Sequence, residues 1–147
     1  MNVGEHVSIV VRPHLRRAVF GERLADWLAD GVARHRVVGG LPDGAAALVL
    51  VPEYLRAGAR SVLADLAGTD WSGTVVAVVG YGGRTRGRFA IEDAREALDG
   101  TGAHVLETAL GLDGARIRAE GFGQADLLLR DLLLDRLADE AALAEPA

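Results

Sequence analysis

Apolar residues along this chain fall into short runs separated by longer amphipathic stretches. Three runs rich in β-branched residues predict strands near 7–11, 48–51 and 74–79, and a fourth strand is expected at 104–110. Continuous apolar strands of this kind occur when both faces of a sheet are covered, as in parallel sheets. The pattern therefore predicts a sheet that is buried between two layers of helices.

Between these runs, apolar positions recur with the spacing of one face of a helix. This periodicity predicts helices at residues 20–34, 55–66, 91–98 and 124–143. Leu24, Trp27 and Leu28 share one stripe of the first helix, and Gly100 and Gly102 end the third. Strands that alternate with helices predict a right-handed, mostly parallel α/β fold, which we expect to form one domain over residues 1–147.

The connection before the strand at 48–51 is unusually short. Residues 35–38 look like a further strand, yet only residues 39–46 separate them from the next one. A parallel crossover normally takes about a dozen residues or more and usually contains a helix. Residues 35–38 are therefore either a strand followed by an extended crossover, or a loop or antiparallel edge. Both alternatives leave the sheet without one covering helix.

The last helix has an apolar arc that is wider than one face of a sheet requires. Its leucines include two blocks of three, at 127–129 and 132–134, followed by Leu137. We expect the helix from Leu127 to Leu137 to pack partly in a homodimer or a higher oligomer. The alternative is a core helix that packs only within its own chain.

Composition excludes several classes of function. A net charge of −5 and a pI near 5.3 argue against a nucleic-acid-binding protein, and all 16 basic residues are arginine. The absence of cysteine excludes disulfides and thiolate chemistry. The histidines show no metal-ligand spacing, so no metal site is predicted, and no serine has the surroundings of a nucleophile. No signal peptide or membrane-spanning run is visible, so no membrane contact and a cytoplasmic location are expected.

The candidate binding residues follow two of the predicted strands, where ligands bind in open α/β sheets. They are Pro52, Glu53, Tyr54 and Leu55 after one strand, and Tyr81, Gly82, Gly83 and Arg84 after the other. The two glycines permit a close approach of the backbone to a planar ring and a positive φ. We interpret Glu53 either as a lone carboxylate at the strand end or as part of a surface salt bridge.

These turns resemble those of the NADPH-dependent FMN reductase family. Pro52-Glu53-Tyr54 stands where that family has Pro-Glu-Tyr-Asn, and Gly80-Tyr81-Gly82-Gly83 resembles its next glycine turn; the likeness extends over residues 46–103. The resemblance implies a three-layer flavodoxin-like sandwich that lacks the helix between strands 2 and 3, which here are residues 35–38 and 48–51. It also implies that FMN lies between the two turns beside Tyr54 or Tyr81, and that NADPH or NADH is the reductant. Arg84, Arg86 and Arg88 either bind the phosphate of that nucleotide or form a solvated basic turn.

The loop that holds the flavin phosphate in this family is altered here. The family's Ser-Leu-Arg-x-x-Ser-x-Asn pattern aligns from His14, so that Leu15 and Arg16 match, whereas His14, Val19 and Gly21 replace the two serines and the asparagine. Leu55 likewise replaces an asparagine.

Arg16, Arg17 and the start of the following helix could still attract an anion, or the arginines form a solvated rim. Two hypotheses follow. The chain is an NAD(P)H-dependent FMN reductase-like oxidoreductase, or it is a flavin-free relative that serves as a binding or assembly subunit or in another small-molecule reaction.

Overall fold

A computed structural model of the chain describes residues 9–12, 19–35, 46–53, 57–83 and 85–144. The strands are β1 (Ile9–Arg12), β2 (Ala46–Pro52), β3 (Val75–Gly82), β4 (His104–Val105) and β5 (Leu110–Asp113). The helices are α1 (Val19–His35), α2 (Ala57–Gly68), α3 (Arg88–Leu98), α4 (Gly114–Glu120) and α5 (Gln124–Ala144).

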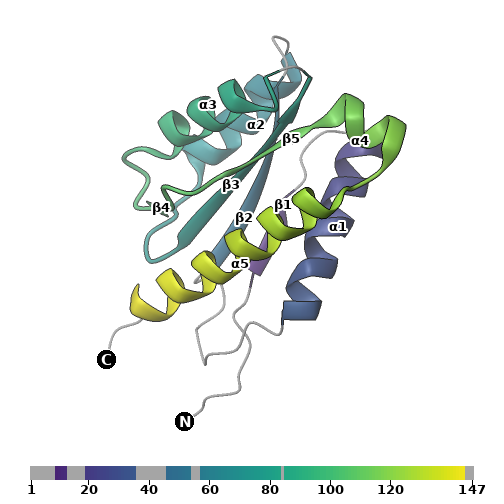
Figure 1. Cartoon of the computed structure of the whole chain (residues 1–147). Coiled ribbons are helices and arrows are strands. Elements are labelled where there is room, and N and C mark those ends of the chain that lie inside the picture. The colour runs from purple at the N-terminus through teal and green to yellow at the C-terminus, as the bar shows by residue number, and fades with distance from the viewer. Residues whose placement is uncertain (1–8, 13–18, 36–45, 54–56, 84, 145–147) are drawn as a thin grey trace.

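All strand pairs of the sheet are parallel. The order is β1-β2-β3, and both β4 and β5 pair with the free edge of β3. Figure 1 shows the sheet between two helical layers, with α2 and α3 on one face and α1 and α5 on the other. The predicted three-layer α/β architecture is confirmed, because parallel strands need crossovers that place helices on both faces.

The alternation of side chains along the central strands divides the core in two. On β2, Ala46, Leu48 and Leu50 face α1 and α5, whereas Ala47, Val49 and Val51 face α2 and α3. On the outer layers, Leu24 and Leu28 of α1 meet the first of these clusters, and Leu98 of α3 meets the second. Burial of both faces explains why the sequence of β2 and β3 is apolar at every position.

One prediction about the last part of the sheet needs correction. The strand expected at 104–110 is split into β4 and β5, because residues 106–109 stand opposite only Ala77 and Val78 of β3. Helix α4 follows β5 directly and was not predicted. The short strand or loop expected at 35–38 falls almost wholly outside the described residues, since α1 continues to His35.

None of the helices in the described ranges is long and apolar enough to cross a membrane.

Candidate functional site

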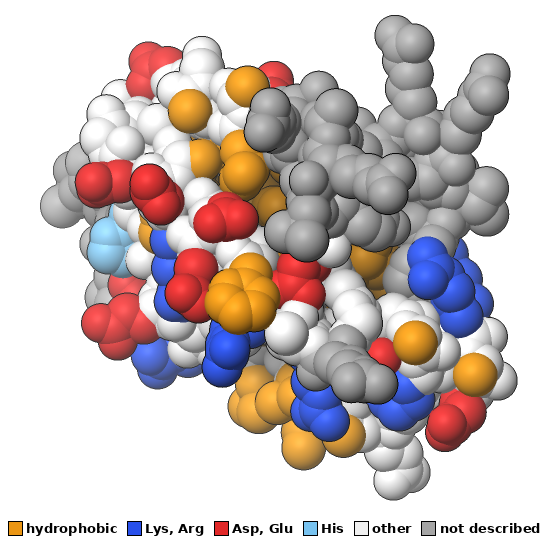
Figure 2. Space-filling model, turned by 90° about the horizontal axis from the view of Figure 1, so that it is seen from above, with side chains coloured by type: hydrophobic (Ala, Val, Ile, Leu, Met, Phe, Trp, Pro, Cys, Tyr) orange, Lys and Arg blue, Asp and Glu red, His pale blue; other side chains and the backbone are white. Residues whose placement is uncertain are grey.

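The carboxyl ends of β2, β3 and β5 meet at one edge of the sheet. Pro52 is opposite Tyr81 in the register of β2 with β3, and Gly82 is opposite Asp113 in the register of β3 with β5. Open α/β sheets bind ligands outside this edge. Figure 2 looks down on the molecule from this side.

Glu53 connects the end of β2 to the start of α3. One carboxylate oxygen accepts a hydrogen bond from the hydroxyl of Thr85, and the other accepts one from the backbone N–H of Phe89 at 2.8 Å. The residue at the N-cap of α3 is Gly87, which has no side chain to offer. Glu53 therefore caps α3 from a different segment, where the helix dipole also favours a negative charge. Sequence reasoning missed this role, because capping residues are sought next to the helix that they cap.

Glycines in and beside the loop after β3 allow backbones to approach closely. A Cβ on Gly80 would lie 2.5 Å from the carbonyl oxygen of Gly87, and a Cβ on Gly111 would lie 2.5 Å from that of Arg86. A Cβ on Gly82 would lie 2.6 Å from Glu53 Oε1. Residues 86 and 87 are thus packed against β5 and β3, which limits the conformations of their backbone.

The positive φ expected at Gly82-Gly83 lies further along the same loop. Neither glycine has a positive φ; Arg86 has φ 54° and Gly87 has φ 75°. Gly83 is exposed, and among the residues that the structure describes no atom lies within 4 Å of a Cβ placed on it. The backbone at Gly83 is therefore open to a ligand, whereas Gly82 is required by the contact with Glu53.

Tyr81 points into the core rather than over the edge of the sheet. Its side chain is 5% exposed and belongs to the cluster beneath α1 and α5, and its strand neighbour Leu112 is buried in the same cluster. Pro52 is also buried, at the last position of β2. In this conformation neither residue presents a side chain to a ring outside the strand ends.

The remaining predicted site residues lie outside the described residues. These are His14, Arg16, Arg17, Tyr54, Leu55 and Arg84. The structure therefore describes one half of the predicted site, formed by Glu53 and the loop after β3. It does not describe the half that follows β1.

A second network holds the elements after β5. The Asp113 carboxylate accepts a hydrogen bond from Arg116 N at 3.0 Å and caps α4. The Arg116 guanidinium contacts both oxygens of Asp126 at 2.7 and 2.6 Å, and Asp126 also accepts from Gly123 N at 2.8 Å, so it caps α5. The hydrogen bond to Asp126 raises the pKa of Arg116 above its ordinary value. The sequence signal for α4 was Asp113 ahead of a short helical stretch.

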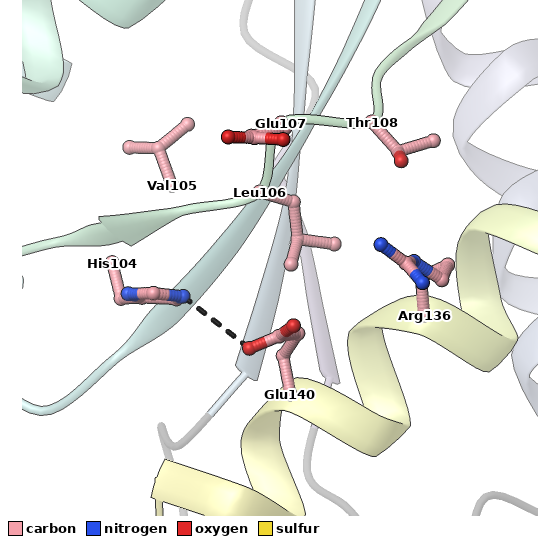
Figure 3. A pocket seen from close by; sticks show the side chains of 7 residues that line it. All are labelled: His104, Val105, Leu106, Glu107, Thr108, Arg136 and Glu140. Carbon is pink, nitrogen blue, oxygen red and sulfur yellow. Dashed lines mark ion pairs between the residues drawn. The ribbon is translucent and has the colours of Figure 1, made fainter.

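The break between β4 and β5 opens a pocket of about 380 Å³ on the side of α5. Figure 3 shows the ring of His104 directed at Glu140, with His104 Nε2 at 3.5 Å from Glu140 Oε2. Thr108 and Arg136 line the same pocket, with Leu106 at its floor. On the opposite side of the break, Arg95 of α3 donates hydrogen bonds to the carbonyl oxygens of Leu106 and Glu107. Arg95 thus ties the residues between β4 and β5 to α3. The pocket is open to solvent and is lined by both polar and apolar side chains, and it lies away from the carboxyl ends of the strands.

Two solved structures match most of this chain. One is a short-chain flavodoxin associated with a non-canonical PDU bacterial microcompartment, with a TM-score of 0.66 and 16% identity over 92% of this chain and 99% of that one. The fold is flavodoxin-like. The other is a flavodoxin from Streptococcus pneumoniae TIGR4, with a TM-score of 0.65 and 20% identity over 90% of this chain and 98% of that one.

The sequence matches no model of a protein family and no curated protein. The flavodoxin-like fold confirms that part of the resemblance described above, whereas a specific relation to the NADPH-dependent FMN reductases stays a prediction. In a flavodoxin-like sheet the ligand crevice lies outside the carboxyl ends of the strands at the topological switch point. The described part of that edge is the loop after β3 and its link to Glu53.

Proposed function

We propose that this flavodoxin-like chain binds FMN at the carboxyl edge of the sheet and acts in electron transfer. The observation that carries the proposal is the end of the loop after β3, where Arg86 and Gly87 pack against glycines of β5 and β3 and Thr85 is tied to Glu53, while Gly83 is left exposed. A planar ring needs a fixed backbone that it can approach closely, and an open glycine meets this need. Both similar structures are flavodoxins.

The residues in the described half of the site fit such a ring in their chemistry. When bound, FMN would supply the redox chemistry, and the protein supplies binding and orientation. Glu53 holds Thr85 and the start of α3 through hydrogen bonds to the Thr85 hydroxyl and to Phe89 N, which limits the movement of this part of the loop. The segments after β1 and β2, which carry Arg16, Arg17, Tyr54 and Leu55, would complete the site.

The finer form of the proposal is an NAD(P)H-dependent FMN reductase. It is supported by the sequence resemblance and by the exposed Arg86 and Arg88, which lie beside Arg84 in the sequence and provide positive charge for a nucleotide phosphate. A cytoplasmic location belongs to the same proposal.

The test is titration of FMN with the purified protein, in which quenching of the flavin fluorescence reports binding. Gly83→Leu is the informative variant, because it fills the open space without a clash or a positive φ, and we expect it to weaken FMN binding at least roughly tenfold. Gly68→Leu is the matched control, since Gly68 is equally open and lies at the end of α2. No binding of FMN at micromolar concentrations would overturn the proposal.

Two further measurements test whether the protein holds the flavin phosphate and whether it is a reductase. Comparison of FMN with riboflavin shows whether the altered loop from His14 to Gly21 still holds the phosphate, because the two ligands differ only in that group. Oxidation of NADPH or NADH by the FMN-loaded protein tests the reductase activity. A protein that binds FMN but oxidises neither nucleotide would be an electron carrier.

The second candidate function is a flavin-free binding or assembly subunit, or a protein recruited to another small-molecule reaction. The observation in its favour is the replacement of two serines and an asparagine by His14, Val19 and Gly21 in the loop that resembles a phosphate site. This candidate predicts a colourless protein whose affinity for FMN and riboflavin is equally negligible.

A further inference from the structure

The pocket between α5 and the break of the last strand arises from a shift in strand register. Val76 of β3 is opposite Val105, whereas Val79 is opposite Leu110, so the register shifts by two residues between β4 and β5. The extra residues leave the ladder and form one wall of the pocket, and α5 forms the other. Extra residues in a strand are over-represented next to binding sites, where they change the direction of a side chain.

The charges on the α5 wall of this pocket are not paired as the helix geometry alone would suggest. Arg136 and Glu140 are four residues apart, a spacing at which opposite charges on a helix are neighbours. Glu140 is instead 3.5 Å from Nε2 of His104, on β4. Arg136 is exposed and has no ion pair or hydrogen bond among the residues that the structure describes. Its guanidinium is therefore available to a ligand.

Thr108 provides a second available donor at the same end of the pocket. Figure 3 shows its hydroxyl oxygen on the side of Arg136, whereas the carboxylates of Glu107 and Glu140 lie toward the other end. Neither the hydroxyl nor the backbone N–H of Thr108 has a hydrogen-bond partner within the described ranges. A guanidinium beside a hydroxyl suits an oxyanion, and the planar fork of arginine matches the two oxygens of a carboxylate.

The other residues of the pocket restrict the charge and shape of this anion. Glu107 and Glu140 carry negative charges, which disfavour a second negative charge on the ligand. Leu106 lies at the floor between the two ends and is 5% exposed. The volume of about 380 Å³ is larger than a bare carboxylate requires, so a short hydrocarbon chain has room beside Leu106. The pocket therefore suits an anion with a single charge and a short apolar chain.

We propose that this pocket binds a small monocarboxylate, whose carboxylate contacts Arg136 and Thr108 and whose hydrocarbon chain contacts Leu106. The ligand then supplies the counter-charge that Glu140 does not give to Arg136. Because the donors are few and the pocket is open, we expect dissociation constants on the order of 1 mM. The pocket lies away from the carboxyl ends of the strands, so this inference is independent of flavin binding.

The first test is titration of the isotope-labelled full chain with acetate, propionate and butyrate, in which NMR shifts of the backbone amides report binding. The amides of Leu106 and Thr108 should shift, and the affinity should rise roughly twofold or more for each added methylene. Inorganic phosphate should bind more weakly than butyrate. The proposal is overturned if these amides do not shift at about 50 mM butyrate, or if phosphate binds more tightly.

The second test removes the two donors one at a time. Arg136→Gln should weaken butyrate binding at least roughly tenfold, and Thr108→Val should weaken it roughly threefold. Arg118→Gln on α4 is the matched control for loss of an exposed arginine and should leave binding unchanged. Arg136 and Thr108 are exposed, so the variants should fold, which circular dichroism checks. Unchanged affinity in Arg136→Gln would show that the carboxylate binds elsewhere.

The third test concerns the arrangement of the ligand in the pocket. Glu140→Gln removes a negative charge from the end opposite Arg136, so this variant should bind butyrate at least as tightly as the wild type. Weaker binding would mean that Glu140 itself holds the ligand, and the proposed arrangement would be wrong.

Discussion

The guanidinium group of Arg130 lies over the indole ring of Trp27, with its central carbon 4.9 Å from the ring centroid. Arg130 is only 3% exposed, and its Nη1 donates a hydrogen bond of 3.0 Å to the carbonyl oxygen of Trp27. Trp27 also stacks on Phe122, whose ring centroid is 4.2 Å away at an interplanar angle of 7°. The contacts of Arg130 with Trp27 join α5 to α1, and a buried arginine is tolerated there because it has a π face, a carbonyl and Asp131 as partners.

Gly31 is the residue that makes room for Arg130. A Cβ on Gly31 would lie 2.6 Å from Arg130 Nε and 2.8 Å from its Cδ. A glycine-to-alanine change inside a helix ordinarily stabilises it by about 1 kcal/mol. Gly31→Ala should instead lower the free energy of unfolding by roughly 1–2 kcal/mol, because the buried guanidinium must move away from its partners. Denaturation by urea measures the sign, and a stabilised Gly31→Ala protein would contradict the packing described here.

Removal of Glu53 should loosen the start of α3. Glu53→Ala takes away the acceptor for Phe89 N and the partner of the Thr85 hydroxyl. We expect a loss of about 1–2 kcal/mol, as for other capping residues. Hydrogen exchange at the Phe89 amide should accelerate more than exchange in α2. Equal acceleration throughout the chain would mean that Glu53 acts only on global stability.

Gly87 and Gly83 should respond very differently to the same substitution. In Gly87→Ala, the new Cβ would lie 2.3 Å from the carbonyl carbon of Gly80, at a residue with φ 75°. This combination of a backbone clash and strain should cost more than roughly 3 kcal/mol. Gly83→Ala should change stability by less than about 0.5 kcal/mol, because its Cβ meets no atom. Thermal unfolding of the two variants side by side gives the comparison.

Asp126 should matter more for stability than an exposed acid. Asp126→Asn breaks the paired contact with Arg116 and weakens the cap of α5 at Gly123. Because Asp126 is 7% exposed and Arg116 is left without its main partner, we expect a loss of roughly 2–3 kcal/mol. Asp93→Asn, on the exposed face of α3, is the matched control and should be nearly neutral. A similar cost for both would mean that net charge, rather than this contact, sets the effect.

The layered α/β architecture could be predicted from the sequence, because its signals are local. Strands β2 and β3 are buried on both faces, so nearly every residue in them is apolar, and α1 shows the periodic apolar positions of a packed helix. The strand-end turns could be located for the same reason, since each follows an apolar run directly. The division of the last strand could not, because residues 106–109 are compatible with a strand until their register with β3 is known.

The roles of individual side chains were decided by the tertiary structure. Glu53 caps a helix that starts 35 residues later, and Arg130 is buried against a tryptophan that is 103 positions away. Neither contact leaves a pattern in the sequence near either partner, because the partners are far apart along the chain and adjacent only in the folded structure. The sequence by itself determined which segments are strands and helices and where ligand-binding turns are expected. The tertiary structure decided that Gly82 is in contact with Glu53 whereas Gly83 is exposed, and that only some of the leucines of α5 pack in the core of the chain.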